Sequence, residues 1–214
     1  PPPLRDEALK LITEAAQEEA QRCRASFVLF DYLEEEEAHL PAWPGSFAAT
    51  SIADPGTRLH ITWSSFEDYL AHLSKSARKD YRRHRNRAAD QAIRVKCQQL
   101  TAPLEPHVVA QAMALIHNVD KHHKSPPHPW GREMLEKAYL VDAAWITASI
   151  GDRMVGCGLL IGDGDVRFLA LLGLDYRVQY VYFQLFYVAI QHAIESGVLF
   201  FFKQKTAYEM KLRL

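Results

Sequence analysis

A dense run of cations is the first feature of this sequence that could do chemistry. The segment from Lys75 to Ala88, KSARKDYRRHRNRA, holds seven Lys or Arg residues and one Asp, in a chain whose formal net charge is −1. On a helix at roughly 100° per residue, Lys75, Arg78, Lys79 and Arg82 share one face. The opposite face is apolar, so one side of the helix can anchor it while the other binds.

The spacing of these cations suits a phosphate-bearing ligand. At ~1.5 Å rise per residue, the distance from Lys75 to Arg82 is about 10 Å, which matches a diphosphate or two adjacent phosphates of an RNA backbone. Arginine also binds phosphate through two parallel hydrogen bonds. The alternative is a basic face that is only solvated. The residues predicted to bind the ligand are Lys75, Arg78, Lys79, Arg82 and Arg83.

A group rich in histidine is the second set of residues that could bind a metal or act in catalysis. The set consists of His117, Asp120, His122, His123 and His128. The histidine spacings are five, one and five, whereas a zinc site on a helix wants two histidines about four residues apart on one face. We therefore expect no metal site. Histidine titrates near neutral pH, so one of these residues could act as a general acid or base. The alternative is that they are ordinary loop histidines without a role in catalysis.

Composition limits the class of protein. At 214 residues and 48% hydrophobic content, the chain can build one sizeable core or one domain and part of another. A net charge near zero argues against a protein that coats nucleic acid generally. The three cysteines are far apart and lack metal-ligand spacing, and the N-terminal residues resemble no export signal. The simplest setting is the cytoplasm.

Hydrophobic periodicity predicts the elements that position these residues. Three strands, 143–150, 154–161 and 166–174, are joined by short turns and should form an antiparallel meander. A long helix should begin at a capping box of Ser64 and Glu67 and run to about residue 91, with His84 on its apolar side as a neutral core histidine. The segment 117–130 reads as a loop. Further strands are expected at 26–33, 47–52, 58–63, 93–100 and 198–202, and further helices at 4–22, 34–40, 105–116, 131–140, 178–196 and from 206.

Two parts of the chain have similar element order. Residues 4–40 and 178–212 both read as long helix, strand and short helix, which suggests an internal repeat. We expect residues 1–60 to be the C-terminal remnant of a first α/β unit and residues 61–214 to be a second, C-terminally truncated one. The helix at 178–196 is too polar and too rich in tyrosine to span a membrane, so it should be buried against the sheet.

The order of meander, long helix, strand and helix resembles the GNAT acyltransferase superfamily. The strings FEDYLAHLSKSARKDYRRHRNRA, HNVDKHHKSPP and GLDYRVQYVYFQLFYVAIQHAIESG, followed by TAYEMKLRL, are similar to the second domain of FemAB-like acyltransferases. This resemblance implies a GNAT-like α/β fold with a mixed, mainly antiparallel sheet flanked by helices, in the second of two tandem units. It also implies transfer of an acyl or aminoacyl group to an amine of a cell-wall precursor or similar substrate.

The resemblance assigns roles to individual residues. Asp175 and Tyr176 follow the central strand, where ligands bind in α/β folds; Asp175 could instead cap the next helix. From its chemistry rather than from the resemblance, His122 or His123 would help to bind or deprotonate the acceptor amine. Tyr208 and Lys211 correspond in position to groups that assist the leaving group. The predicted catalytic residues are thus His122, Asp175, Tyr208 and Lys211, and Tyr176 joins the substrate-binding set.

The acyl donor is either acyl-CoA or aminoacyl-tRNA. The junction LLGLDYRVQYVY has Gly173 but no glycine loop after it, unlike the helix N-terminus that usually holds the pyrophosphate of acetyl-CoA. This departure favours the branch that uses charged tRNA. The expected partners are a phosphate-bearing small molecule or a lipid-linked substrate, with tRNA as a further candidate. Two alternatives stay open, an RNA-binding module without catalysis and a GNAT-like scaffold that has lost its donor site.

Overall fold

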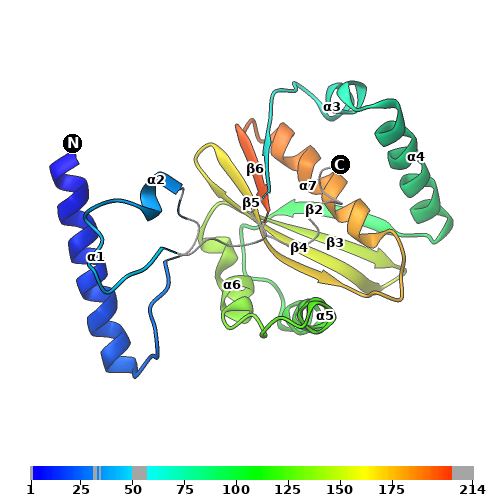
Figure 1. Cartoon of the computed structure of the whole chain (residues 1–214). Helices are drawn as coiled ribbons and strands as arrows, with labels where there is room; N and C mark the ends of the chain where they lie inside the picture. Colours follow the sequence, from blue (N-terminus) through cyan, green and yellow to red (C-terminus); the bar gives the residue numbers. More distant parts are fainter. Residues whose placement is uncertain (1, 31–32, 34, 50–56, 204–214) are drawn as a thin grey trace. The chain divides into compact units, whose positions relative to one another are not determined.

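The computed structural model describes residues 2–30, 33, 35–49 and 57–203 (Figure 1). The chain divides into two compact units, Pro1–Ala53 and Asp54–Leu214. The predicted division at residue 60, into a remnant of one GNAT-like unit and a second unit, stays a prediction.

The first unit contains two helices and an aromatic cluster. Helix α1 (Pro2–Cys23) is followed by the short helix α2 (Glu35–Ala38). The rings of Phe30, Trp43 and Phe47 lie 5.2 to 5.7 Å apart between centroids. The strand predicted at 26–33 is wrong for residues 26–30 and 33, which form no strand, and the strand predicted at 47–52 is wrong for 47–49 while 50–52 lie outside the described residues. The repeat therefore lacks its middle element in the described part of the chain.

The second unit is built on a six-stranded sheet in the order β1-β6-β5-β4-β3-β2 (Figure 1). Its strands are β1 (Thr57–His60), β2 (Arg94–Gln99), β3 (Ala143–Ile150), β4 (Arg153–Asp163), β5 (Val166–Leu174) and β6 (Phe200–Lys203). All neighbours are antiparallel except β5 and β6, which are parallel. The meander and the predicted fold class, a mixed, mainly antiparallel sheet flanked by helices, are confirmed.

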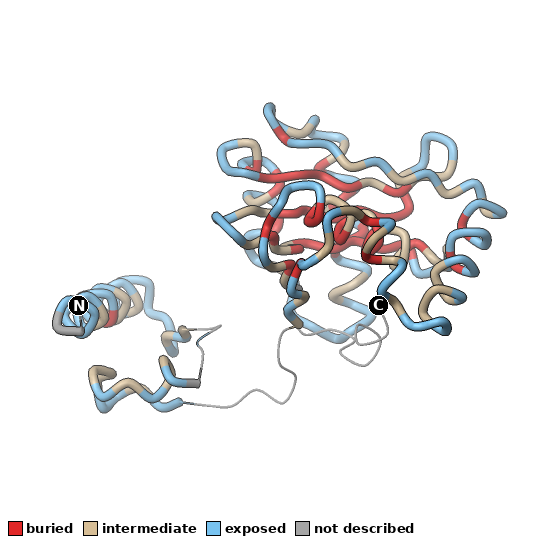
Figure 2. The backbone as a smooth tube through the Cα atoms, turned by 90° about the horizontal axis from the view of Figure 1, so that it is seen from above, coloured by how far each residue is buried: buried red, intermediate tan, exposed pale blue. Residues whose placement is uncertain are grey.

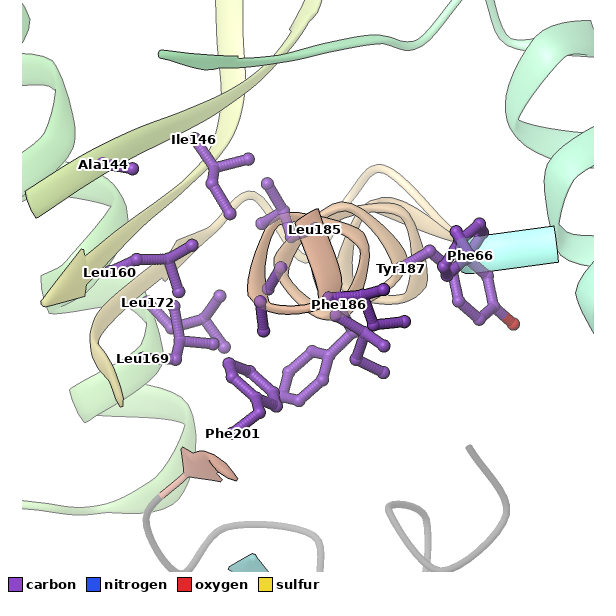
Figure 3. Packing of buried hydrophobic residues seen from close by; sticks show 14 of the residues in the cluster. Phe66, Ala144, Ile146, Leu160, Leu169, Leu172, Leu185, Phe186, Tyr187 and Phe201 are labelled. Carbon is purple, nitrogen blue, oxygen red and sulfur yellow. The ribbon is translucent and has the colours of Figure 1, made fainter. Parts of the chain in front are cut away.

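Helices cover both faces of this sheet. Helix α7 (Val181–Glu195) packs on one face, with α3 (Phe66–His72) and α4 (Lys75–Asp90) against its outer side. Helices α5 (Pro106–His123) and α6 (Gly131–Lys137) cover the other face, followed by the short 3-10 helix η1 (Ala138–Leu140). Buried residues gather along the strands and α7 (Figure 2). In the core, Leu185 faces Ile146 and Leu160, and Phe186 points toward Phe201 (Figure 3).

The long helix predicted from residue 64 is in fact two helices, because the chain breaks at Leu73 and Ser74. Leu73 is extended, with ψ 152°, and the Ser74 hydroxyl accepts a hydrogen bond from Ala77 N, which begins α4. The predicted capping box is also displaced by one residue. The hydroxyl of Ser65, the N-cap, accepts from Asp68 N, while Asp68 Oδ2 accepts from Ser64 N, one residue before the N-cap. The pattern differs from a standard capping box in this second bond, which the N-cap N–H would otherwise donate.

The loop predicted at 117–130 is wrong over its first seven residues, because α5 continues to His123. Lys124 then adopts a left-handed conformation with φ 54°, and Ser125 N donates to Asp120 O. A left-handed residue of this kind is a common way to end a helix. The prolines that suggested a loop begin only at Pro126, so His117, Asp120, His122 and His123 stand on a helix.

Candidate functional site

A β-bulge interrupts the middle of β5. Pairing between β5 and β6 ends at Leu169 and Lys203, and the β4–β5 register skips Ala170, which is a β-bulge. A bulge bends a strand and often terminates its pairing. Beyond the bulge, residues 171–174 of β5 stay paired with β4 and lead to Asp175 and Tyr176.

A close helix–strand contact brings α5 to this end of β5. A Cβ added at Gly173 would lie 2.7 Å from Cys157 Sγ, 2.8 Å from Leu115 Cβ and 2.9 Å from Ile116 N. Only glycine fits at such distances, so Gly173 allows α5 to lie directly on the strand. One turn further along α5, Asn118 Nδ2 donates to Leu174 O at 3.3 Å. The last turn of α5 thus lies beside the end of β5.

This contact places the predicted His122 against the predicted Tyr176. Their rings stack with centroids 4.0 Å apart and planes 17° apart, and Tyr176 is 42% exposed. The Tyr176 hydroxyl also lies 3.3 Å from His123 Nε2, with the donor set by the histidine tautomer. The imidazoles of His122 and His123 and the phenol of Tyr176 therefore meet at one point of the surface, where a ligand can reach them.

Asp175, the next predicted residue, is held by two arginines. Its Oδ1 accepts from Arg177 Nε at 2.9 Å and from Arg177 N at 3.1 Å, and its Oδ2 accepts from Arg177 Nη2 at 2.9 Å and Arg153 Nη1 at 2.8 Å. The hydrogen bonds from the Arg177 guanidinium hold the pKa of the Asp175 carboxyl well below its usual range, against the opposing effect of burial. Asp175 does not cap α7, since the N-cap position belongs to Tyr180, which makes no side-chain cap bond.

Sequence reasoning missed Arg153 and Arg177. Arg177 could have been noticed because it follows Asp175 by two residues. Arg153 lies 22 residues before Asp175 and reaches it only because β4 and β5 are adjacent, with Asp175 N donating to Val155 O at 2.9 Å. Since the side chains of Arg153 and Arg177 are 56% and 85% exposed, their cationic edges remain open to solvent beside Tyr176.

The predicted basic residues lie on a different surface, the outer side of α4. Lys75, Lys79 and Arg82 are exposed and form no ion pair within the described residues. Arg78 instead donates to the carbonyl oxygens of Ala71 and Leu73 at 2.8 and 2.6 Å, and so completes the end of α3. Arg83 pairs with Asp80 at 2.8 Å. The structure does not bring this surface together with the His122 and Tyr176 pair, because α7 lies between α4 and the sheet.

His84 anchors α4, as predicted. Its ring is 7% exposed and stacks on Phe183 with centroids 3.8 Å apart, and the prediction of a buried, hydrogen-bonded histidine is confirmed. Tyr208 and Lys211 lie outside the described residues. Among described side chains, no group of three or more His, Cys, Asp or Glu residues could hold a metal ion. No helix in the described ranges combines the length and apolar character that a bilayer span requires.

Residues 4–205 of the chain match a family model of FemAB-like proteins described as peptidoglycan biosynthesis/recognition. No curated protein matches the chain in sequence. Among solved structures, FemX is similar with a TM-score of 0.55 and 8% identity, over 75% of this chain and 57% of that one.

Two further structures share the fold. The C-terminal domain of a putative lysylphosphatidylglycerol synthetase from Agrobacterium fabrum has a TM-score of 0.51 and 11% identity, over 71% of this chain and 46% of that one. L-PGS from Bacillus licheniformis has a TM-score of 0.51 and 12% identity, over the same shares of 71% and 46%. The chain therefore spans about half the length of these structural relatives, and identities this low indicate a shared fold.

Proposed function

Because the chain belongs to the FemAB-like family, we propose that it is an acyl- or aminoacyltransferase acting on an amine of a phosphate-bearing, cell-wall-related substrate. The observation that carries the proposal is the stack of His122 on Tyr176, in which an exposed imidazole lies against a phenol beside the end of β5. In the proposed reaction the acceptor amine would bind against this histidine.

The reaction would proceed by direct attack. The amine nitrogen forms a bond to the acyl carbon, and the C–S bond of a thioester or the C–O bond of an aminoacyl ester breaks. His122 would accept the proton that the amine loses, with Tyr176 fixing its ring, while Tyr208 or Lys211 would return a proton to the leaving thiolate or ribose oxygen. Since both of its carboxylate oxygens accept hydrogen bonds from arginine, Asp175 would serve by positioning the loop. Orientation supplies much of the rate enhancement in such a reaction.

The exposed cations of α4 would hold phosphate groups of the substrate or of a tRNA donor. Lys75, Lys79 and Arg82 carry this part of the proposal because they have no ion-pair partner among the described residues. Acyl-CoA and aminoacyl-tRNA are both cytoplasmic donors, so the proposal also places the reaction in the cytoplasm.

The test combines binding with turnover. Acetyl-CoA, alanyl-tRNA and a UDP-linked muropeptide precursor are titrated by calorimetry, and acyl transfer to the precursor is followed with each donor. His122→Ala should lower kcat by about a hundredfold or more. His117→Ala is the matched control, since His117 is an exposed histidine of the same helix. Absence of transfer by the wild-type protein with both donors would contradict the proposal.

A second pair of variants tests the α4 surface. Lys79→Ala/Arg82→Ala should weaken binding of the phosphate-bearing ligand and reduce the dependence of its affinity on salt. Arg87→Ala serves as control, because Arg87 faces Asp90 at 3.8 Å. Salt-dependent RNA binding without turnover would favour the RNA-binding module instead.

A further inference from the structure

A groove of about 340 Å³ lies at the start of α5, at the opposite end of this helix from His122. The end of β2, the loop of residues 100–105 and the first turn of α5 border it, and side chains of β3 and β4 contribute to its lining. A volume of this size is within the range of ligand-binding sites. The lining combines apolar, amide and hydroxyl groups, and it includes Gln98, Gln99, Leu104, Val108, Trp145 and Thr147.

Beside the groove, β2 has an outer edge to which no strand of the described part of the chain is paired. On the inner edge, Leu100 N donates to Ala143 O at 2.8 Å. In an antiparallel ladder every second residue makes such inward bonds, and the residues between them direct their backbone N–H and C=O groups outward. The outward-directed residues of β2 are Val95, Cys97 and Gln99. An unpaired row of this kind is a template for an added strand.

This edge and the groove meet at Gln99. Gln99 lies opposite Ala144, which belongs to the core beneath α7, and its side-chain amide donates to Asp142 Oδ1 at 2.8 Å. The Gln99 side chain is thus turned away from the α5 face, so its main chain borders the groove. Gln98 lies opposite Trp145 and directs its side chain to the α5 face. A strand added here would place every second side chain on the same face as the groove.

The α5 face of β2 also carries two cations. Arg94 and Lys96 alternate with Gln98 on this face; they are exposed and form no ion pair with any residue that the structure describes. The residues opposite them on β3, Ser149 and Thr147, are uncharged. Opposite charges on facing strands stabilise the pairing. An added strand should therefore carry carboxylates opposite Arg94 and Lys96 and an apolar side chain opposite Gln98, where the groove lies.

We propose that the outer edge of β2 and this groove form a binding site for an extended acidic peptide, which pairs with β2 and inserts one apolar side chain into the groove. Hydrogen bonds to the outward N–H and C=O groups of Cys97 and Gln99 would supply affinity, while the groove and the two cations would supply specificity. The site is separate from the His122 and Tyr176 pair, and the proposal does not depend on acyl transfer.

The first test uses the peptide acetyl-TFTETE-amide. Antiparallel pairing sets its phenylalanine opposite Gln98 and its glutamates opposite Lys96 and Arg94. Calorimetry should give a Kd below about 1 mM. On saturation, amide hydrogen exchange at Val95, Cys97 and Gln99 should slow by about tenfold or more, because these amides gain partners. The amides of Lys96 and Gln98 already face β3, so their exchange should change less.

Two pairs of variants test the edge and the charge. Gln99→Pro removes an outward N–H at a sheet edge, where proline is tolerated, and Gln99→Ala is the matched control, because it loses the same side chain but keeps the N–H. Gln99→Pro should bind the peptide about tenfold more weakly than Gln99→Ala. Lys96→Glu should also weaken binding by about tenfold, whereas Lys79→Glu on α4 should not.

A third pair tests the groove. Ala102→Trp fills it from an exposed loop position, and Ala110→Trp adds the same side chain at an exposed position of α5 outside it. Ala102→Trp should weaken binding by about tenfold or more, with Tm close to that of Ala110→Trp. If Gln99→Pro lowers Tm, this pair and the exchange pattern decide. The proposal is overturned by absence of binding at about 1 mM peptide, by equal affinity for acetyl-TFTKTK-amide, or by binding without slower exchange at the outward amides.

Discussion

His84 Nδ1 lies 2.9 Å from the hydroxyl of Tyr187, a residue 103 positions away in the sequence. This hydrogen bond joins α4 to α7, and Tyr81 adds an edge-on contact with the Tyr187 ring at 4.8 Å between centroids. The helix that carries the basic surface is thereby fixed to the helix that follows the Asp175–Tyr176 segment of the candidate site.

Removal of the hydroxyl should therefore weaken the fold. Tyr187→Phe leaves a buried imidazole nitrogen without its partner, and we expect the free energy of unfolding to fall by about 1 to 3 kcal/mol. Urea denaturation at pH 7.5 measures this. Tyr139→Phe is a control, since the Tyr139 hydroxyl forms no hydrogen bond with the residues that the structure describes. Equal stability of Tyr187→Phe and the wild type would contradict the prediction.

Mild acid should destabilise the protein through His84. Burial lowers the pKa of this imidazole, and the charge of Arg83 lowers it further while Asp80 raises it. The unfolded chain then binds a proton from about pH 6.5 downward, before the folded protein does, so stability falls as pH drops below that value. Tm at pH 7.5 and pH 5.5 should differ less in His84→Gln than in the wild type.

Some acid dependence should persist in that variant. Burial and the charge of Arg167 also lower the pKa of His192. His192 should therefore also make the folded protein less stable as the pH falls. If Tm falls equally with pH in His84→Gln and in the wild type, the acid dependence comes from other groups and the prediction for His84 is wrong.

Asp175→Asn should lower stability at neutral pH. The carboxylate accepts from Arg153 and Arg177, but both guanidinium groups are solvent-exposed and can be hydrated without it, so we expect a loss of about 1 to 2 kcal/mol. Because the folded pKa of Asp175 is depressed, its stabilisation is present above the unfolded pKa of about 3.9 and is lost as pH falls through the folded pKa.

The difference between Asp175→Asn and the wild type should thus narrow below about pH 4. Chemical denaturation at pH 7 and pH 3 measures it. Asp90→Asn, which removes an exposed partner of Arg87, should change stability by no more than about 0.5 kcal/mol. A difference that is constant with pH would show that the charge of Asp175 is not what stabilises the loop.

Gly173→Ala should disturb both stability and activity. The added methyl group would overlap Leu115 and the backbone of Ile116, so we expect a loss of about 1 to 3 kcal/mol and a displacement of α5 from β5. That shift would separate His122 from Tyr176 and lower kcat. Gly45→Ala is the control, because nothing lies within 4 Å of its added methyl group. Unchanged Tm and kcat in Gly173→Ala would show that α5 can move without cost.

Local pattern predicted much of this fold. Strand alternation and short turns were sufficient to predict the meander, since hairpins depend on residues that are neighbours in the sequence. The apolar face of the α4 segment correctly indicated that His84 is buried. Where two local signals competed, the prediction failed. Ser74 carried a capping signal inside a longer helical pattern. The histidines from His117 to His123 were assigned to the proline-containing loop, which begins only after His123.

The sequence by itself determined the family, the mainly antiparallel sheet and the residue types available for chemistry, because these depend on composition and on contacts between near neighbours. Only the tertiary structure decided which of those residues meet. His122 reaches Tyr176 through the close approach at Gly173, and Arg153 reaches Asp175 through strand register. The basic surface of α4 lies apart from both of these residue pairs, because α7 packs between α4 and the sheet. A linear sequence pattern cannot show such a separation in space.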